Sequence, residues 1–359
     1  HNMQLSGGSD KFRYYVSVGY SYQEGMWSTT DYSKYNAMVN LDIDATKYTK
    51  VNIGLSGWHE DKNYPAIAAG DIMYQAYRTP PVSAIYYSNG LWGQYVGKSL
   101  IGQVYHSGYD QQRTNQLNTS ITIEQEIPFV KGLSIKGVLN YDPYHDRDKT
   151  WATPMPVYTL DASKSPYDYT LGYQGPEKPN LTSNASESTN FTYQGIINYV
   201  NTFGKHTVSL LGVAEARERQ VWNLNAKRLN YGILVDEINA GSNNPDDISN
   251  GGNSWKERQV GYVYRLGYNY SNRYMVEFSG RYDGHYYFAP GKKFGFFPAI
   301  SVGWNIGEES FLQKSAEWLD KLKVRVSYGT SGNLAGSSYQ YMSDYGFGNG
   351  ANFNGTPTM

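Results

Sequence analysis

The sequence predicts a transmembrane antiparallel β-barrel, because polar and apolar residues alternate over segments long enough to cross a bilayer. In the segment 12–22, Val16 and Tyr20 point to one face and Ser17 to the other. A period of two over nine or more residues is typical of a β-strand with two different faces. Soluble strands average about five or six residues, whereas a tilted strand needs about 9–11 residues to span a membrane. Alternation and length together favour membrane-spanning strands.

The composition fits such a barrel and argues against other classes of protein. Of the 359 residues, 36 are tyrosine and 38 are glycine, and 18% are charged. Tyrosine combines an apolar ring with a polar hydroxyl, which suits the aromatic girdles at the rims of a barrel. A net charge of −1 gives no reason to expect a nucleic-acid partner. The sequence has no cysteine, which excludes disulfides and thiol catalysis within it.

Twelve segments show the alternation and give the order of the predicted wall. They are 1–7, 11–22, 33–44, 49–58, 115–127, 132–142, 188–200, 205–216, 257–270, 273–283, 293–306 and 321–330. Long loops are expected near 59–114, 143–187 and 217–256, and shorter loops near 23–32 and 284–292. The remaining connections are short. Short turns at the periplasmic rim and long loops at the outer rim are typical of bacterial outer-membrane barrels.

Two connections are expected to contain helix. The connection 307–320 begins with Glu308 and Glu309 and then carries apolar residues at helical spacing. In the first long loop, the segment 71–77 predicts two helical turns that end before Pro80.

We expect these strands to be an internal part of a larger barrel. A complete barrel of this class has both ends in the periplasm and an even number of strands. Twelve strands alone would leave two edges in lipid, where each unpaired backbone group costs several kcal/mol. We therefore expect at least one strand before His1 and at least one after Met359.

Motifs for catalysis or metal binding are weak. No pair of histidines has the H-x-x-x-H spacing of a zinc site, and neither a G-x-S-x-G motif nor a P-loop is present. His59, His106 and His145 fall in expected outer loops and are better interpreted as solvated than as catalytic. The carboxylates between Asp236 and Asp247 lack the spacing of a calcium loop, so a hydrated loop is the better interpretation. The sequence therefore predicts no enzyme, no catalytic residue, no metal site and no cofactor.

Charged residues in the middle of the strands should face the lumen, because on the lipid side each would cost roughly 2–4 kcal/mol. They are Arg13, Arg265, Arg281, Lys323, Arg325, Asp42, Glu124, Glu126, Glu277 and Asp283. Such residues could hold a plug or guide a solute. For each one, an ion pair that stabilises the wall is the simpler interpretation.

The expected outer loops are rich in aromatic residues, which can stack on the apolar faces of sugar rings or bind peptide side chains. The candidate substrate-binding residues are Trp58, Arg78, Tyr87, Trp92, Tyr95, Trp151 and Tyr158. The alternative for each aromatic residue is packing inside the loops.

Several segments resemble the barrel of SusC/RagA-type TonB-dependent transporters. The early motifs are His1–Gly8, Arg13–Tyr20, Gln23–Gly25 and Tyr77–Pro81. The most specific motifs are 273–284, 288–299, 303–304, 308–311 and 322–333. One departure is His285-Tyr286-Tyr287, where the family usually has small polar residues and an arginine.

The resemblance implies an outer-membrane barrel of about 22 strands closed by a plug domain. The chain would supply the second to the thirteenth strand, without the plug domain, the first strand and the C-terminal strands. Such transporters import a bulky nutrient, commonly an oligosaccharide, with a SusD-like surface lipoprotein and with energy from the TonB complex, which acts through the absent N-terminal region. An oligopeptide importer, or an outer-membrane binding or adhesion barrel without active transport, stays open as an alternative. The expected surroundings are outer-membrane lipid.

Overall fold

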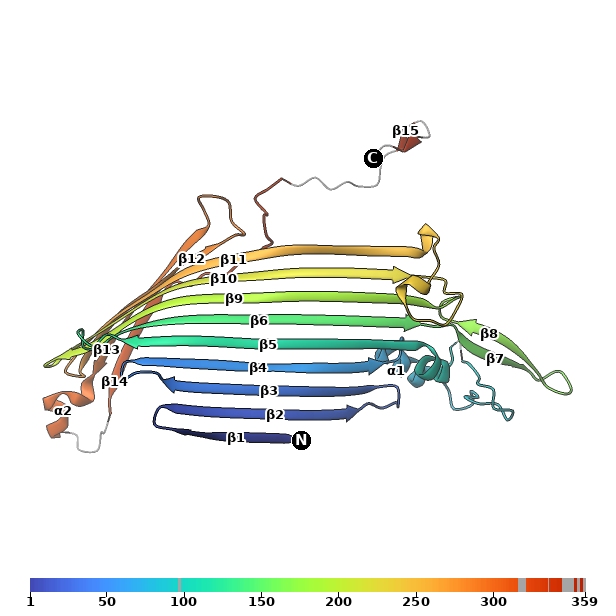
Figure 1. Ribbon diagram of the computed structural model, residues 1–359, viewed down its shortest axis with the longest axis horizontal. Helices are drawn as coiled ribbons and strands as arrows, with labels where there is room; N and C mark the ends of the chain where they lie inside the picture. Colours follow the sequence, from blue (N-terminus) through green and yellow to red (C-terminus); the bar gives the residue numbers. More distant parts are fainter. Residues whose placement is uncertain (96–97, 316–320, 335, 344–351, 354–355, 358–359) are drawn as a thin grey trace. The chain divides into compact units, whose positions relative to one another are not determined.

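The computed structural model describes residues 1–95, 98–315, 321–334, 336–343, 352–353 and 356–357. Its main element is a 12-stranded sheet in the order β1-β2-β3-β4-β5-β6-β9-β10-β11-β12-β13-β14 (Figure 1). Strands that follow one another in this order pair antiparallel, and the separate β7–β8 hairpin is inserted between β6 and β9. The twelve predicted strands, their order and the all-β fold class are confirmed.

The bounds of the elements are as follows. The strands of the large sheet are β1 (Asn2–Ser9), β2 (Phe12–Glu24), β3 (Asp31–Asp44), β4 (Thr49–Tyr64), β5 (Gly108–Glu126), β6 (Leu133–Ala152), β9 (Asn180–Phe203), β10 (His206–Arg228), β11 (Ile248–Tyr270), β12 (Tyr274–His285), β13 (Phe294–Asn305) and β14 (Lys323–Gly329). The short strands are β7 (Met155–Asp161), β8 (Asp168–Gln174), β15 (Asn352–Phe353) and β16 (Thr356–Pro357). The helical elements are α1 (Ala69–Arg78), η1 (Gly102–His106), η2 (Ile238–Ala240), η3 (Pro245–Asp247), η4 (Ile306–Glu308) and α2 (Ser310–Ser315).

Several strands are longer than predicted at their loop ends. β9 covers 24 residues and β10 covers 23, so the loops expected over 143–187 and 217–256 are partly strand. Likewise, β4 and β5 extend into the expected loop 59–114. Beyond the membrane no lipid requires apolar residues at every second position, but backbone pairing continues, so the strand persists after the sequence signal has ended.

One of the two expected helices is confirmed in full, and the other is described only in part. The helix predicted over 71–77 is confirmed as α1. In the connection 307–320, η4 and α2 supply helical turns, and residues 316–320 lie outside the described residues. Among the described residues, no helix has the length and apolar character needed to cross a membrane.

The chain divides into two compact units. Unit 1 comprises residues 1–123, 138–192 and 219–256, and unit 2 comprises residues 124–137, 193–218 and 257–359.

In unit 1 the strand register gathers apolar side chains on one face of the sheet. Val16 of β2 lies opposite Leu5 of β1 and Val39 of β3, and Val39 lies opposite Leu55 of β4. Ser17, the next residue along β2, belongs to the other face and is buried. The alternation in the sequence is therefore a true separation of two faces.

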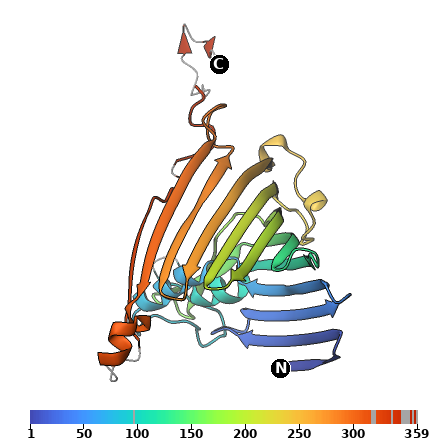
Figure 2. The same cartoon turned by 90° about the vertical axis from the view of Figure 1, so that its left-hand side faces the viewer.

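Unit 2 shows the same separation. Leu266 of β11 lies opposite Phe278, Phe278 opposite Ile300, and Ile300 opposite Tyr328 of β14. The orange strands β12 to β14 run side by side in Figure 2. All four side chains of this row are exposed, as expected for a surface that lipid covers in a membrane barrel.

Candidate functional site

In unit 1, ordered connections form a layer at one end of the long strands. Figure 1 shows α1 and the β7–β8 hairpin at the same end of β4 and β6. Eight hydrophobic residues of the described chain are buried, and all belong to unit 1: Ile72, Val104, Trp151, Met155, Val157, Leu181, Val221 and Tyr231. The loop end of unit 1 therefore has a small apolar core of its own, which can hold binding side chains in place.

α1 is positioned by both its ends and its buried face. Asp71 in the first turn and Arg78 in the last turn complement the helix dipole. Ile72 and Gln75 are buried, and the Gln75 Nε2 donates a hydrogen bond of 3.1 Å to the carbonyl oxygen of Tyr95. The Arg78 guanidinium lies over the ring of Tyr74 at 5.0 Å, and both side chains are exposed. This helix thus links two candidate residues, Arg78 and Tyr95.

Three further candidates are brought together between the first long loop and β7. The Tyr87 hydroxyl donates to the carbonyl oxygen of Tyr158 at 3.2 Å, and the Tyr158 N–H donates to the carbonyl oxygen of Trp92 at 3.2 Å. The Tyr87 ring also packs on Tyr169 with ring centroids 5.2 Å apart. Trp92, Tyr87 and Tyr158 are all partly exposed. The structure therefore supplies an ordered, partly exposed aromatic surface, which we call the loop platform.

His106 borders the loop platform. Its ring is nearly perpendicular to that of Trp92, at an interplanar angle of 79° and with ring centroids 3.9 Å apart. Burial lowers the pKa of His106 below its usual value, so the imidazole is neutral at physiological pH. A neutral ring can both donate and accept a hydrogen bond, as a sugar hydroxyl requires.

Two candidates lie apart from the loop platform. Trp58 is on β4, where the Lys34 Nζ sits 4.9 Å from the centre of its ring. Trp151 is buried against Leu181 and meets Tyr231 edge-on at 4.7 Å. The structure thus gives Trp151 the packing role that was the alternative for each aromatic residue. A ligand contact stays a prediction for all seven candidates.

The expected positions of two histidines were wrong. His59 lies in β4 and His145 in β6, not in loops, because both strands extend beyond their predicted ends. Each belongs to the apolar face of its strand, where His59 Nδ1 contacts Asn115 Oδ1 at 2.8 Å and His145 Nδ1 contacts Glu187 Oε1 at 3.4 Å.

Asp236, at the start of the carboxylate-rich segment, attaches the connection between β10 and β11 to strands β5 and β6. Asp236 accepts a hydrogen bond of 2.7 Å from the Lys149 Nζ and another from the Tyr109 hydroxyl. These two donors hold the pKa of Asp236 below its usual value. In the part of the chain that the structure describes, no group of three or more His, Asp or Glu residues could hold a metal ion.

Many of the inward charges predicted from the sequence form ion pairs. In unit 1, Arg13 lies 3.8 Å from Asp42. In unit 2, Arg281 pairs with Asp283 at 2.9 Å and with the buried Glu215 at 3.7 Å. The interpretation as wall-stabilising pairs therefore fits these residues.

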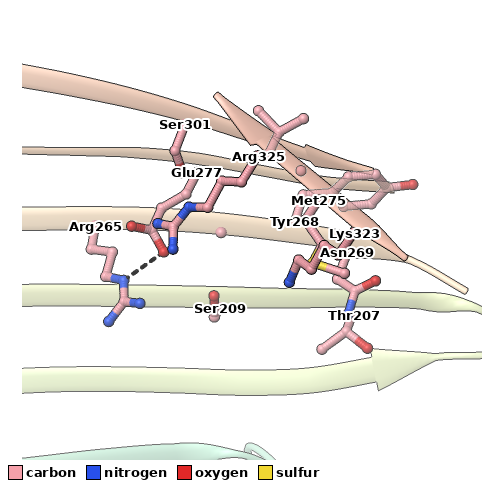
Figure 3. Close-up of a pocket in the computed structure, with 13 residues that line it drawn as sticks. Thr207, Ser209, Arg265, Tyr268, Asn269, Met275, Glu277, Ser301, Lys323 and Arg325 are labelled. Carbon is pink, nitrogen blue, oxygen red and sulfur yellow. Dashed lines mark hydrogen bonds and ion pairs between the residues drawn. The ribbon is translucent and has the colours of Figure 1, made fainter. Parts of the chain in front are cut away.

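One inward surface of unit 2 is hollowed and keeps unpaired positive charge. Figure 3 shows this pocket, of about 350 Å³, with Arg265 bonded to Glu277 at 2.9 Å. Lys323 and Arg325 of β14 also line it, and neither makes an ion pair within the described ranges. The sequence placed these charges inward, but the pocket itself depends on neighbouring strands and had no sequence signal.

Sequence reasoning also missed an aromatic cluster in unit 2. His285 packs against Tyr286 and Tyr287 with ring centroids 4.8 and 4.5 Å apart, and Tyr286 meets Tyr339 at 5.7 Å. The available signal was the departure of His285-Tyr286-Tyr287 from the pattern that the resemblance implies.

No family model matches the chain. Several curated proteins are similar to it. The TonB-dependent receptor P3 of Formosa agariphila is 26% identical over 361 residues, which cover 96% of this chain and 34% of the relative. The TonB-dependent receptor SusC of Bacteroides thetaiotaomicron is 22% identical over 380 residues, which cover 96% of this chain and 35% of SusC. The chain thus spans about a third of the length of these relatives.

Solved structures show the same fold. The structure of the RagAB peptide transporter matches with a TM-score of 0.70 and 19% identity, over 92% of this chain and 36% of that chain. The RagAB peptide importer in its 'open-open' state matches with a TM-score of 0.72 and 18% identity, over 94% of this chain and 37% of that chain. Sequence and fold together confirm the resemblance: the chain is a relative of the SusC/RagA-type TonB-dependent transporters, which are outer-membrane β-barrel proteins.

Proposed function

We propose that the chain is a portion of the barrel of a TonB-dependent outer-membrane importer that takes up an oligosaccharide together with a SusD-like surface lipoprotein. The observation that carries this proposal is the loop platform of unit 1. It presents partly exposed aromatic rings on an ordered layer above a wall with one apolar and one charged face. The relatives named SusC and RagAB support a transport role for the complete protein.

In this proposal the loop platform binds the nutrient at the outer rim. The rings of Trp92 and Tyr87 stack on sugar faces, and the exposed Arg78 donates hydrogen bonds to hydroxyls. Trp58 on β4 would make the next contact along the wall. Trp151 acts from beneath, by holding the layer together. The plug domain and the segment that contacts the TonB complex belong to the rest of the protein, and no residue of the chain has a catalytic role.

An oligopeptide is the alternative cargo. The observation that favours it is the charge on the inward faces, which includes Lys323 and Arg325 in the pocket of Figure 3. Such charges suit peptide carboxylates and carboxylate side chains better than neutral sugars. The solved structures similar to this chain include the RagAB peptide transporter, which supports the same alternative.

The cargo can be tested by calorimetry on the full-length protein with a panel of neutral oligosaccharides and a panel of peptides. We expect an oligosaccharide to bind, and Trp92→Ala to weaken its binding about tenfold, as for an aromatic residue at the centre of an interface. Trp255→Ala, which removes an exposed tryptophan of β11, is the matched control and should have little effect. If only peptides bind, the cargo is an oligopeptide and the proposal of an oligosaccharide is wrong.

Active transport needs a separate test. Cells that carry the full-length protein should accumulate a labelled oligosaccharide, and removal of the inner-membrane proton gradient should stop accumulation while surface binding persists. If wild-type cells bind the label but never accumulate it, the protein is a binding or adhesion barrel and the transport proposal is wrong.

A further inference from the structure

The apolar face of unit 1 has a groove that the alternation of residues does not predict. The groove has a volume of about 710 Å³ and is mostly apolar. Val18, Ala37 and Gly57 lie opposite one another on β2, β3 and β4, on the face that carries Val16, Val39 and Leu55. The groove is therefore continuous with the surface that faces lipid in the outer membrane.

Small residues make the floor of the groove. A Cβ on Gly57 would lie 2.6 Å from the carbonyl oxygen of Gln116, so the close approach of β5 requires glycine there. Ala37 adds one methyl group, while Val18 and Leu117 stand higher on either side and are exposed. A flexible hydrocarbon chain fits such a narrow apolar depression, and its burial there is favourable.

A row of polar side chains closes the groove at one end. Tyr35 lies opposite His59, His59 bonds to Asn115, and His145 belongs to the same lining. The length of β4 from Thr49 to His59 matches the roughly 9–11 residues that a tilted strand needs to cross the hydrocarbon core. Since Thr49 follows a short turn, which faces the periplasm, His59 lies at the level of the outer-leaflet headgroups.

Two arginines lie two residues beyond Asn115 and His145, one on β5 and one on β6. The hydrogen bonds Thr114–Asp146 and Thr150–Asp110 fix the register of β5 and β6, in which Arg113 and Arg147 are opposite one another. Both are exposed, and two-residue spacing puts them on the face of Asn115 and His145.

Nearby carboxylates neutralise the positive charges of Arg113 and Arg147 only in part. Asp61 contacts Arg113 at 3.3 Å and His59 at 2.9 Å, and Glu187 contacts His145 at 3.4 Å. Arg147 makes no ion pair among the described residues. A free guanidinium is a good partner for a phosphate, which it can bind through two parallel hydrogen bonds.

We propose that this face of unit 1 is a binding site for a phosphorylated glycolipid of the outer leaflet. An acyl chain lies in the groove over Ala37 and Gly57, and a headgroup phosphate binds Arg147 with support from Arg113. The row of His59, Asn115 and His145 contacts sugar hydroxyls between them, which favours a glycolipid over a phosphate-bearing lipid without sugars. The site faces away from the lumen and does not depend on the transported cargo.

Native mass spectrometry of the detergent-solubilised full-length protein tests the site with three probes. These are bisphosphorylated lipid A, the same lipid after removal of its phosphates, and phosphatidylglycerol. We expect bisphosphorylated lipid A to bind at least about tenfold more tightly than either of the others, and the double variant R113Q/R147Q to lose that preference. Ala37→Leu, which fills the groove, should weaken binding of lipid A with or without phosphate.

Matched variants separate this site from general attraction to lipid. Arg258→Gln removes an exposed arginine of β11, and Val302→Leu enlarges an exposed apolar residue of β13. Both should bind lipid A as the wild type does, and every variant should keep the heat-dependent gel migration of a folded barrel. Three results would overturn the proposal. They are equal binding of the three probes, a loss of the preference for bisphosphorylated lipid A in R258Q as large as in R113Q/R147Q, and a protein dimer that R113Q/R147Q dissociates.

Discussion

The two units bury different kinds of side chain. In the described chain, every buried hydrophobic residue belongs to unit 1, and most of them lie in or beside the loop layer. In unit 2 the buried side chains with polar groups are two carboxylates, Glu215 and Glu309, and no large apolar side chain of its described part is buried. One polypeptide thus uses two ways of stabilising structure at a membrane.

The difference follows from where water is. The loop layer of unit 1 stands in water, so it needs a small hydrophobic core around Trp151 and Tyr231. The wall of unit 2 leaves its apolar residues to lipid, so its two buried carboxylates are stabilised by polar partners and not by an apolar core. Glu215, on the inward face, contacts Arg217 at 3.0 Å and Arg281 at 3.7 Å. Glu309, in the connection after β13, accepts from the Tyr274 hydroxyl at 2.6 Å.

The largest effect should come from the core of the loop layer. Trp151→Ala removes a buried ring that meets Tyr231 edge-on, and a change of this kind costs about 3–5 kcal/mol. We expect the loops of unit 1 to lose protection in hydrogen exchange while the strands keep it. The exposed Trp255→Ala should leave both unchanged. Loss of protection across the strands as well would show that the loop layer and the wall are one cooperative structure.

The wall of unit 2 offers a matched pair of neighbours. Ile300→Arg puts a charge on the apolar face, where it costs about 2–4 kcal/mol near the middle of the bilayer. Ser301→Arg puts the same charge on the inward face, opposite Glu277, where the pocket of Figure 3 leaves room. In membrane fractions of the full-length protein, we expect folded barrel to be lost for I300R and retained for S301R. Equal insertion of the two variants would contradict the assignment of the faces.

These two regions also differ in how far the sequence could predict them. The alternation around Leu266 and Ile300 has one physical cause, contact with lipid on one side, and it predicted the strands and their faces. The loop ends have no such single cause. The extension of β4 to Tyr64 and the hairpin β7–β8 depend on backbone pairing and on contacts between distant segments, which a local pattern does not record.

The candidate site shows the same limit. Aromatic composition made Trp92 and Trp151 candidate substrate-binding residues, but composition does not separate an exposed ring from a buried one. The separation depends on Tyr231, which comes from another loop 80 residues further along the chain. The cluster around His285 was marked only by its departure from the family pattern.

A smaller effect should come from the inward charges of unit 2. Arg281→Gln removes one cation from the buried Glu215, which keeps Arg217 and the Gln194 Nε2 as partners. Loss of one cation beside a buried carboxylate costs about 1–3 kcal/mol, and we expect the folded barrel to unfold at a lower urea concentration. The exposed pair partner Arg258→Gln is the control. If R281Q is as stable as R258Q, the buried carboxylate of unit 2 is not held by this ion pair.

The smallest effect should be a pH dependence confined to the loop layer of unit 1. Because Lys149 and Tyr109 stabilise its charged form, the pKa of Asp236 lies below the usual value of 3.8. The attachment of this loop is therefore fully present above pH 3.8 and is lost as the pH falls through the lower pKa of the folded state. Hydrogen exchange around Asp236 at a series of pH values, corrected for the intrinsic rate, should show the loss in the wild type. In Asp236→Asn the loop should be less protected at neutral pH and no longer respond over this range. If D236N keeps the acid response of the wild type, another carboxylate holds the loop layer. The difference between the two units would then be limited to the burial of hydrophobic side chains.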